Sequence, residues 1–326
     1  MRRRNFIALL GGAAAAWPLA ARAQPATPVI GFLSARSPAE SASALQAFRH
    51  GLGQSGYFEG KNVTIDYRWA EGRYDRLPAL AAELIRRQVA VIAATGGEPS
   101  PLAAKAATAA IPIVFTIGSD PVDLGLVASL NKPGGNVTGV TFIFAETGSK
   151  RLELVRQLLP NATTIALLVN PSFPLSAAET RDVQAAARTL GVQINVLNAS
   201  IESQIDTTFA TISQQRADAL IVGTDPFLLG QRSQLVQLAG RHAIPTLYFS
   251  REFVDDGGLM SYGANIANGY RQAGVYTGQI LNGANPATLP IVRPTQFLLL
   301  LNLKSAKVLG LEIPPLLLAL ADEVLE

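Results

Sequence analysis

The sequence predicts an α/β protein of two Rossmann-like lobes, each built around a parallel sheet, and three observations lead to this prediction. Short apolar runs rich in β-branched residues alternate with amphipathic helical patterns along most of the 326 residues. Such alternation is typical of parallel sheets with right-handed crossovers. The pattern occurs twice, and the chain passes between the two copies near residues 142, 264 and 291, which predicts a hinge with three crossings.

The first copy alternates strand and helix from residue 29 onward, and Gly or Pro closes most of its elements. Strands are predicted at 29–34, 63–67, 89–94 and 111–117, and helices at 39–52, 74–87, 100–109 and from about 121. Ser119 and Asp120 precede Pro121, an arrangement that favours a helix N-terminus.

The second copy repeats this order. Its strands are predicted at 165–169, 193–197, 219–222 and 243–246, with helices at 175–190, 205–215 and 228–241. Residues 243–249 echo residues 110–116, Ala-Ile-Pro followed by β-formers, which indicates a duplicated lobe and not a short repeat. Position for position, Ser34 matches Asn170, Thr95 matches Thr224, and Thr116 falls near Phe249.

The remaining segments connect and complete the lobes. They comprise predicted strands at 137–142, 258–263 and 297–302 and helices at 147–159, 265–281 and 303–309. We expect an N-terminal lobe of residues 28–142 plus 265–290 and a C-terminal lobe of residues 143–264 plus 291–326.

The first 23 residues have the three parts of a secretory signal peptide. Arg2, Arg3 and Arg4 precede an apolar, Ala-rich run, and Ala21-Arg22-Ala23 is an A-x-A cleavage signature. Arg3-Arg4-Asn5-Phe6-Ile7 favours a twin-arginine export signal over an ordinary secretory one. We therefore expect cleavage after Ala23 and a periplasmic protein.

Composition excludes several classes of function. A chain that is 48% hydrophobic can bury a large core, and the absence of cysteine removes disulfides, thiolate metal sites and cysteine nucleophiles. The first 23 residues hold four arginines and no acid, so their removal takes the formal net charge from +3 to −1. A weakly acidic mature chain gives no reason to expect binding to nucleic acid.

Polar side chains follow the predicted strands. In an open α/β sheet, ligands bind beyond the carboxyl ends of the strands, where Thr116, Ser119 and Asp120 are expected. These residues could instead have purely structural roles. Asp120 and Asp225 each precede a proline and could serve only as helix caps, and Thr95-Gly96-Gly97 could be only a tight turn.

Several motifs extend over the whole mature chain: Gly-Phe-Leu-Ser-Ala-Arg-Ser-Pro at 31–38, Gly-Ser-Asp-Pro-Val-Asp-Leu-Gly at 118–125, and Lys-Pro-Gly-Gly-Asn-Val-Thr-Gly-Val-Thr at 132–141. With Tyr-Arg-Trp-Ala-Glu-Gly-Arg-Tyr-Asp-Arg-Leu-Pro at 67–78 and Asn-Leu-Lys-Ser-Ala-Lys-Val-Leu-Gly at 302–310, they make the chain resemble the periplasmic substrate-binding proteins of ABC importers. The similarity is greatest to the subgroup that includes tryptophan- and tyrosine-type binding proteins.

The resemblance implies a type I periplasmic-binding fold that closes on a small solute and docks on a membrane permease as a monomer, without a cofactor. The solute would be an amino acid, aromatic ones included, or a small organic acid. The resemblance implies these ligand-binding residues: Ser34, Thr95, Gly96, Thr116, Ser119 and Asp120 from the first lobe, and Asn170, Ser172, Thr224, Asp225, Phe249, Ser250 and Glu252 from the second.

Two other functions are compatible with an exported α/β protein. A sensory receptor of the same fold would share all these features. An exported enzyme is disfavoured because no Gly-x-Ser-x-Gly elbow and no histidine-centred triad occur in the sequence. His50 and His242 have no metal-ligand partner at a useful spacing, so no metal site is predicted.

Overall fold

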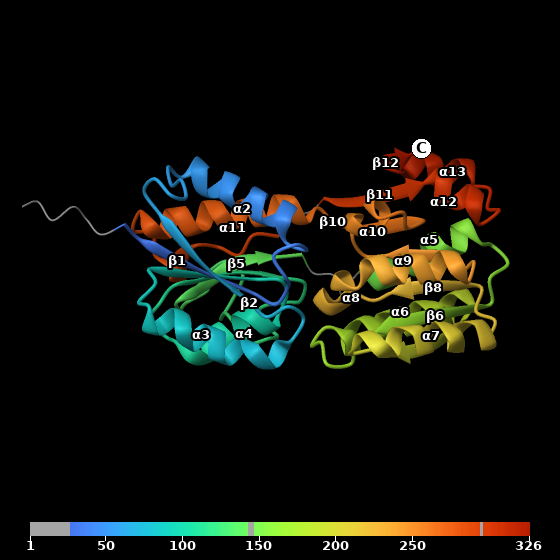
Figure 1. Ribbon diagram of the computed structural model, residues 1–326, viewed down its shortest axis with the longest axis horizontal. Helices are drawn as coiled ribbons and strands as arrows, with labels where there is room; N and C mark the ends of the chain where they lie inside the picture. Colours follow the sequence, from blue (N-terminus) through green and yellow to red (C-terminus); the bar gives the residue numbers. More distant parts are fainter. Residues whose placement is uncertain (1–26, 143–146, 294–295) are drawn as a thin grey trace, which may run out of the picture.

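The structure, a computed structural model, describes residues 27–142, 147–293 and 296–326. The predicted signal peptide at 1–23 lies outside the described residues. Two lobes lie side by side along the long axis of the molecule (Figure 1), and each holds one sheet. The predicted α/β class with two sheet-centred lobes is confirmed.

The first lobe holds a parallel sheet in the order β2-β1-β3-β4-β5. Helices α2 and α11 cover one face of this sheet, and α3 and α4 cover the other (Figure 1). The strands are β1 (Val29–Ser34), β2 (Thr64–Trp69), β3 (Val91–Thr95), β4 (Ile113–Ile117) and β5 (Val137–Thr141). The helices are α2 (Ala42–Gln54), η1 (Tyr74–Arg76), α3 (Leu77–Arg86), α4 (Pro99–Ala107), α11 (Ile266–Leu281) and η3 (Pro286–Thr288).

The second lobe holds a larger sheet in the order β12-β11-β10-β9-β8-β6-β7. Its strands are β6 (Thr164–Val169), β7 (Gln193–Asn198), β8 (Ala219–Val222), β9 (Thr246–Tyr248), β10 (Met260–Ala264), β11 (Phe297–Asn302) and β12 (Glu323–Leu325). Its helices are α5 (Gly148–Leu158), α6 (Ser176–Leu190), α7 (Glu202–Gln214), α8 (Pro226–Gly230), α9 (Arg232–Arg241), α10 (Arg251–Asp255), α12 (Leu303–Val308) and α13 (Pro315–Leu320). The sheet is parallel except for the pair β10 and β11, which are antiparallel.

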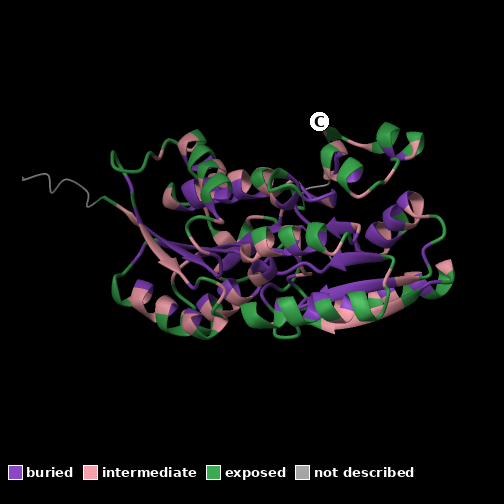
Figure 2. Ribbon diagram, turned by 45° about the vertical axis from the view of Figure 1, so that its right-hand side comes forward, coloured by how far each residue is buried: buried purple, intermediate pink, exposed green. Residues whose placement is uncertain are grey.

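Side-chain alternation explains why each sheet has an apolar core on both faces. Along β1, Ile30 and Phe32 join the core beneath α2, while Leu33 joins the core on the opposite face. Continuous apolar runs of this kind are expected for parallel strands covered on both sides. Figure 2 shows the central strands buried between helices whose outer faces are exposed.

Close packing of α11 against α2 places a late segment of the chain in the first lobe. A Cβ atom at Gly274 would lie 2.0 Å from the Phe48 carbonyl oxygen, and one at Gly51 would lie 1.8 Å from that of Arg271. Only glycine permits such an approach of two helix backbones. The chain therefore returns to the first lobe after β10 and leaves it again before β11.

The described parts of the crossings lie close together. The backbone N–H of Asn265 donates to the Gln296 carbonyl oxygen at 3.2 Å, which joins the second crossing to the third. Parts of the first and third crossings, residues 143–146 and 294–295, lie outside the described residues.

Some predicted elements were wrong in detail. No helix begins at Pro121; instead the Asp120 carboxylate accepts from the Val122 N–H at 2.7 Å, and the chain turns toward Gly125. The single helix predicted at 228–241 is two helices, α8 and α9, and the strand predicted at 243–246 begins only at Thr246. Helices α10 and α13 and strand β12 were not predicted.

Candidate ligand-binding site

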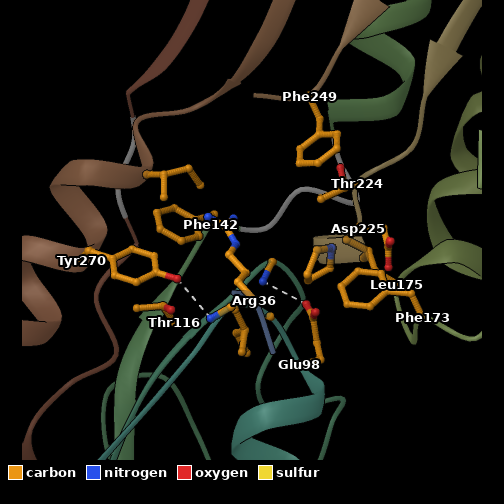
Figure 3. A pocket seen from close by; sticks show the side chains of 16 residues that line it. Arg36, Glu98, Thr116, Phe142, Phe173, Leu175, Thr224, Asp225, Phe249 and Tyr270 are labelled. Atoms are coloured by element: carbon orange, nitrogen blue, oxygen red, sulfur yellow. Dashed lines mark hydrogen bonds between the residues drawn. The ribbon is translucent and has the colours of Figure 1, made fainter. Parts of the chain in front are cut away.

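A cavity lies between the lobes, where the carboxyl ends of both sets of parallel strands face each other (Figure 3). The volume inside it that the centre of a water-sized sphere can reach is about 40 Å³. The first lobe contributes Arg36, Gly96, Gly97, Glu98, Thr116, Ile117, Gly118, Phe142, Ile266 and Tyr270, and the second contributes Phe173, Leu175, Thr224, Asp225, Pro226 and Phe249.

Five of the predicted site residues line this cavity, namely Gly96, Thr116, Thr224, Asp225 and Phe249. Each follows or ends a strand, as expected from the position of ligands in open α/β sheets. Gly96 also forms the tight turn that was the alternative interpretation of Thr95-Gly96-Gly97. Its φ is +79°, and a Cβ atom there would lie 2.8 Å from Ser34 Oγ.

Other predicted residues lie one layer behind the cavity wall. Ser34 accepts a hydrogen bond from the Arg36 N–H at 3.2 Å, and Ser119 donates to Glu98 at 2.9 Å. Asn170 donates to Asp225 at 3.1 Å. Thr95 is fully buried at the end of β3. Ser34, Ser119 and Asn170 therefore hold groups that line the cavity in place.

Four predicted residues are directed elsewhere. Asp120 forms the turn described above, and Ser172 is exposed, with its N–H donating to Asn170 at 3.0 Å. Ser250 donates to Glu252, and both line a separate cavity on the hinge side of the molecule. Ile266 lines both cavities.

Aromatic side chains form much of the cavity wall. Phe142 and Tyr270 come from the first lobe, and Phe173 and Phe249 come from the second (Figure 3). The Tyr270 hydroxyl accepts from the Gly96 N–H at 3.1 Å, so its ring is fixed against the glycine turn. Such walls suit a solute with a flat or apolar part. Three of these rings were not predicted from the sequence; Phe142, the last residue of the strand predicted at 137–142, was the only one with a positional signal.

Two charged side chains missed as site residues also reach the cavity. Arg36 is 7% exposed, and Glu98 is fully buried. Within the described part of the chain, Arg36 Nε and Nη1, Glu98 Oε2 and Thr116 Oγ1 have no hydrogen-bond partner. Burial raises the pKa of the Glu98 carboxyl, although hydrogen bonds from Ser119 and the Gly118 N–H oppose this. Arg36 follows the end of β1 by two residues, at the carboxyl edge of the sheet.

Asp225 and Tyr74 connect the lobes at the edge of the cavity. The Tyr74 hydroxyl donates to Asp225 Oδ2 at 2.8 Å and accepts from the Phe227 N–H at 3.3 Å. Asp225 also caps α8, because its Oδ1 accepts from the Leu228 N–H at 2.7 Å. Burial raises the pKa of the Asp225 carboxyl to about 7, against the lowering effect of these hydrogen bonds.

A buried ion pair supports Thr224 from behind. Arg151 is fully buried and pairs with Glu179. Its Nη2 donates to Thr224 Oγ1 at 2.9 Å and to Thr147 Oγ1 at 2.8 Å, and its Nε donates to the Tyr262 carbonyl oxygen at 3.2 Å. This network connects Thr224 in the cavity wall to the N-terminus of α5 and to strand β10.

The described ranges contain no cluster of three or more His, Cys, Asp or Glu side chains that could hold a metal ion. In the same ranges, no helix has the length and apolar character needed to cross a membrane.

Comparison with known proteins agrees with this architecture. A tyrosine-binding protein of Clostridioides difficile (strain R20291) is 27% identical over 269 residues, which cover 82% of this chain and 77% of that protein. The crystal structure of an ABC domain in complex with L-Trp from Streptococcus pneumonia superposes with a TM-score of 0.84 at 26% identity, covering 92% of this chain and 100% of that chain. The ligand-free, open structure of a substrate-binding protein from Clostridium difficile superposes with a TM-score of 0.66 at 25% identity. The superposition covers 91% of this chain and 99% of that chain.

The sequence profile of the family described as ABC transporter substrate binding protein matches residues 29–325, nearly the whole described chain. The two facing lobes and the cavity between them are what such a protein requires. This chain therefore belongs to the ABC transporter substrate-binding proteins.

Proposed function

We propose that this protein is the extracytoplasmic solute receptor of an ABC importer, and that its solute binds in the cavity between the lobes. The observation that carries the proposal is the composition of that cavity: both lobes supply its wall, with aromatic rings from each. A solute held there contacts both lobes only when they are closed, so binding favours closure.

The solute we propose is an amino acid, with aromatic ones included, or a small organic acid. Two named relatives support the choice, a tyrosine-binding protein and a structure in complex with L-Trp. The four aromatic rings offer an apolar surface, while Arg36, Glu98 and Thr116 offer charged and polar groups.

The moving bodies we propose are residues 28–142 plus 265–290 and residues 143–264 plus 291–326. Gly96, Thr116, Thr224, Asp225 and Phe249 would contact the solute, and the residues behind them would hold these groups in place. The export signal at 1–23 would deliver a monomer to the periplasm, where the closed form docks on permease subunits and no catalysis takes place.

Native mass spectrometry of residues 24–326, purified from the original host, tests this function. We expect a retained small molecule of the proposed class, or a rise in melting temperature with at least one compound from a panel of amino acids and aromatic acids. A blank across both measurements would contradict the proposal.

A further inference from the structure

The most informative groups in the cavity are the polar atoms that have no hydrogen-bond partner in the described part of the chain. Arg36 Nε and Nη1 and Glu98 Oε2 are buried, and no hydrogen-bond partner for them exists among the described residues. Buried charged groups are normally paired, because an unpaired one loses its hydration without compensation. Figure 3 shows both side chains among the residues that surround the cavity.

The two groups are separate and carry opposite charge when ionised. No ion pair within 4.0 Å joins Arg36 to Glu98 in the described chain, so neither neutralises the other directly. Glu98 is also fixed in orientation, because its Oε1 accepts from the Gly118 N–H and from Ser119 Oγ, both at 2.9 Å. Its second oxygen is thereby left for another donor.

We propose that Arg36 binds the carboxylate of the solute and that Glu98 accepts a hydrogen bond from its ammonium group. The guanidinium fork matches a carboxylate with two parallel hydrogen bonds. One lobe thus recognises both charged groups of a zwitterion, and Phe173 and Phe249 of the other lobe close over its side chain. This inference rests on the proposed function and names the residues that give it specificity.

A set of three aromatic compounds separates the two charge contacts. L-Tryptophan carries both groups, indole-3-propionate carries only the carboxylate, and tryptamine carries only the ammonium. L-Tyrosine, 3-(4-hydroxyphenyl)propionate and tyramine form a second set with a different ring. Titration calorimetry on the mature protein measures Kd for each compound.

For Arg36→Gln we expect Kd to rise about tenfold to a hundredfold for the amino acid and for the propionate. Kd for the amine should stay unchanged. Arg36→Lys, which keeps the charge but not the fork, should recover part of the loss. Glu98→Gln should raise Kd for the amino acid and for the amine, and leave Kd for the propionate unchanged. Arg86→Gln and Asp123→Asn, both on the surface of the same lobe, are the matched controls.

A second readout distinguishes recognition from a structural role. Because Arg36 Nε and Nη1 are buried and have no hydrogen-bond partner among the described residues, replacement of Arg36 by glutamine should leave the melting temperature of the ligand-free protein equal or higher. A large drop in that temperature would show that Arg36 serves the fold and would overturn the proposal.

The binding data can also overturn it in other ways. Equal losses for all three compounds in a set, or no loss for any, would contradict the assigned contacts. A wild-type protein that binds only compounds without a carboxylate would overturn this inference and leave the receptor function standing. A protein that binds no solute, in this set or in the wider panel, would overturn both.

Discussion

At the scale of single residues, the Asp225 carboxyl is the group whose environment most alters its chemistry. It is 1% exposed and accepts hydrogen bonds from Tyr74, Asn170 and the Leu228 N–H. Burial nevertheless dominates and raises its pKa from 3.8 to about 7. The folded protein therefore keeps this proton over a range of pH in which the unfolded chain has released it.

This shift predicts a pH dependence of stability. Between about pH 4 and pH 7 the native state binds one more proton than the unfolded state, so the free energy of unfolding falls as pH rises, by about 1.4 kcal/mol per pH unit from this group. Above pH 7 both states are ionised and the effect ends. Urea unfolding of wild type and Asp225→Asn between pH 4 and 8 should give slopes that differ by this amount, steeper in wild type. Parallel curves would refute it.

A glycine beneath the cavity gives a second prediction. Gly96 has φ of +79° and lies against Ser34, so Gly96→Ala should cost about 1–3 kcal/mol of stability. Gly135→Ala is the matched control, because nothing lies within 4 Å of its Cβ position and no such φ occurs there. Thermal unfolding of the two variants should differ clearly, and equal melting temperatures would rule out the strain.

At the scale of elements, strand ends were predictable and much of the cavity wall was not. Gly96, Thr116 and Thr224 were predictable because they lie at the ends of apolar runs that are visible in the sequence. Tyr270 lies inside α11, and Phe173 lies in a loop, so their positions depend on how distant elements pack. The short helices α8 and α10 have too few residues to show a helical period.

The network behind Thr224 is an element-scale feature that mutation can test. Arg151→Met leaves the buried Glu179 without its counter-ion, and we expect a loss of about 3–5 kcal/mol in unfolding free energy. Lys150→Met removes the neighbouring exposed pair with Glu153 and should cost no more than about 1 kcal/mol. Chemical denaturation compares them, and similar losses would argue against a structural role for the buried pair.

At the scale of the whole molecule, the structure has the features of a closed, two-lobe substrate-binding protein. Phe173 and Leu175 of the second lobe share a core cluster with residues of the first lobe. The TM-score is 0.84 with a structure bound to L-Trp and 0.66 with a ligand-free, open one. The duplicated lobe and its crossings could be predicted from repeated patterns. The closed arrangement could not, because contacts between lobes leave no periodic signal in the sequence.

The Tyr74 hydroxyl stabilises this closed arrangement without lining the cavity. Tyr74→Phe should therefore raise Kd about fivefold to tenfold for every solute alike, as expected for about 1 kcal/mol of lost hydrogen bonding. Tyr57→Phe is the control, because its hydroxyl bonds to Asn282 within one lobe. Titration calorimetry measures both variants, and a loss that differs between solutes would mean that Tyr74 takes part in recognition instead.

Closure on a solute held between the lobes is the central claim, and the distance between the lobes tests it most directly. The chain has no cysteine, so Arg86→Cys on α3 and Thr207→Cys on α7 allow specific labelling with two dyes. These helices lie in different lobes, away from the hinge strands (Figure 1). We predict that a bound solute raises single-molecule energy transfer by shifting molecules into one closed population. Unchanged transfer at saturating solute would contradict the account.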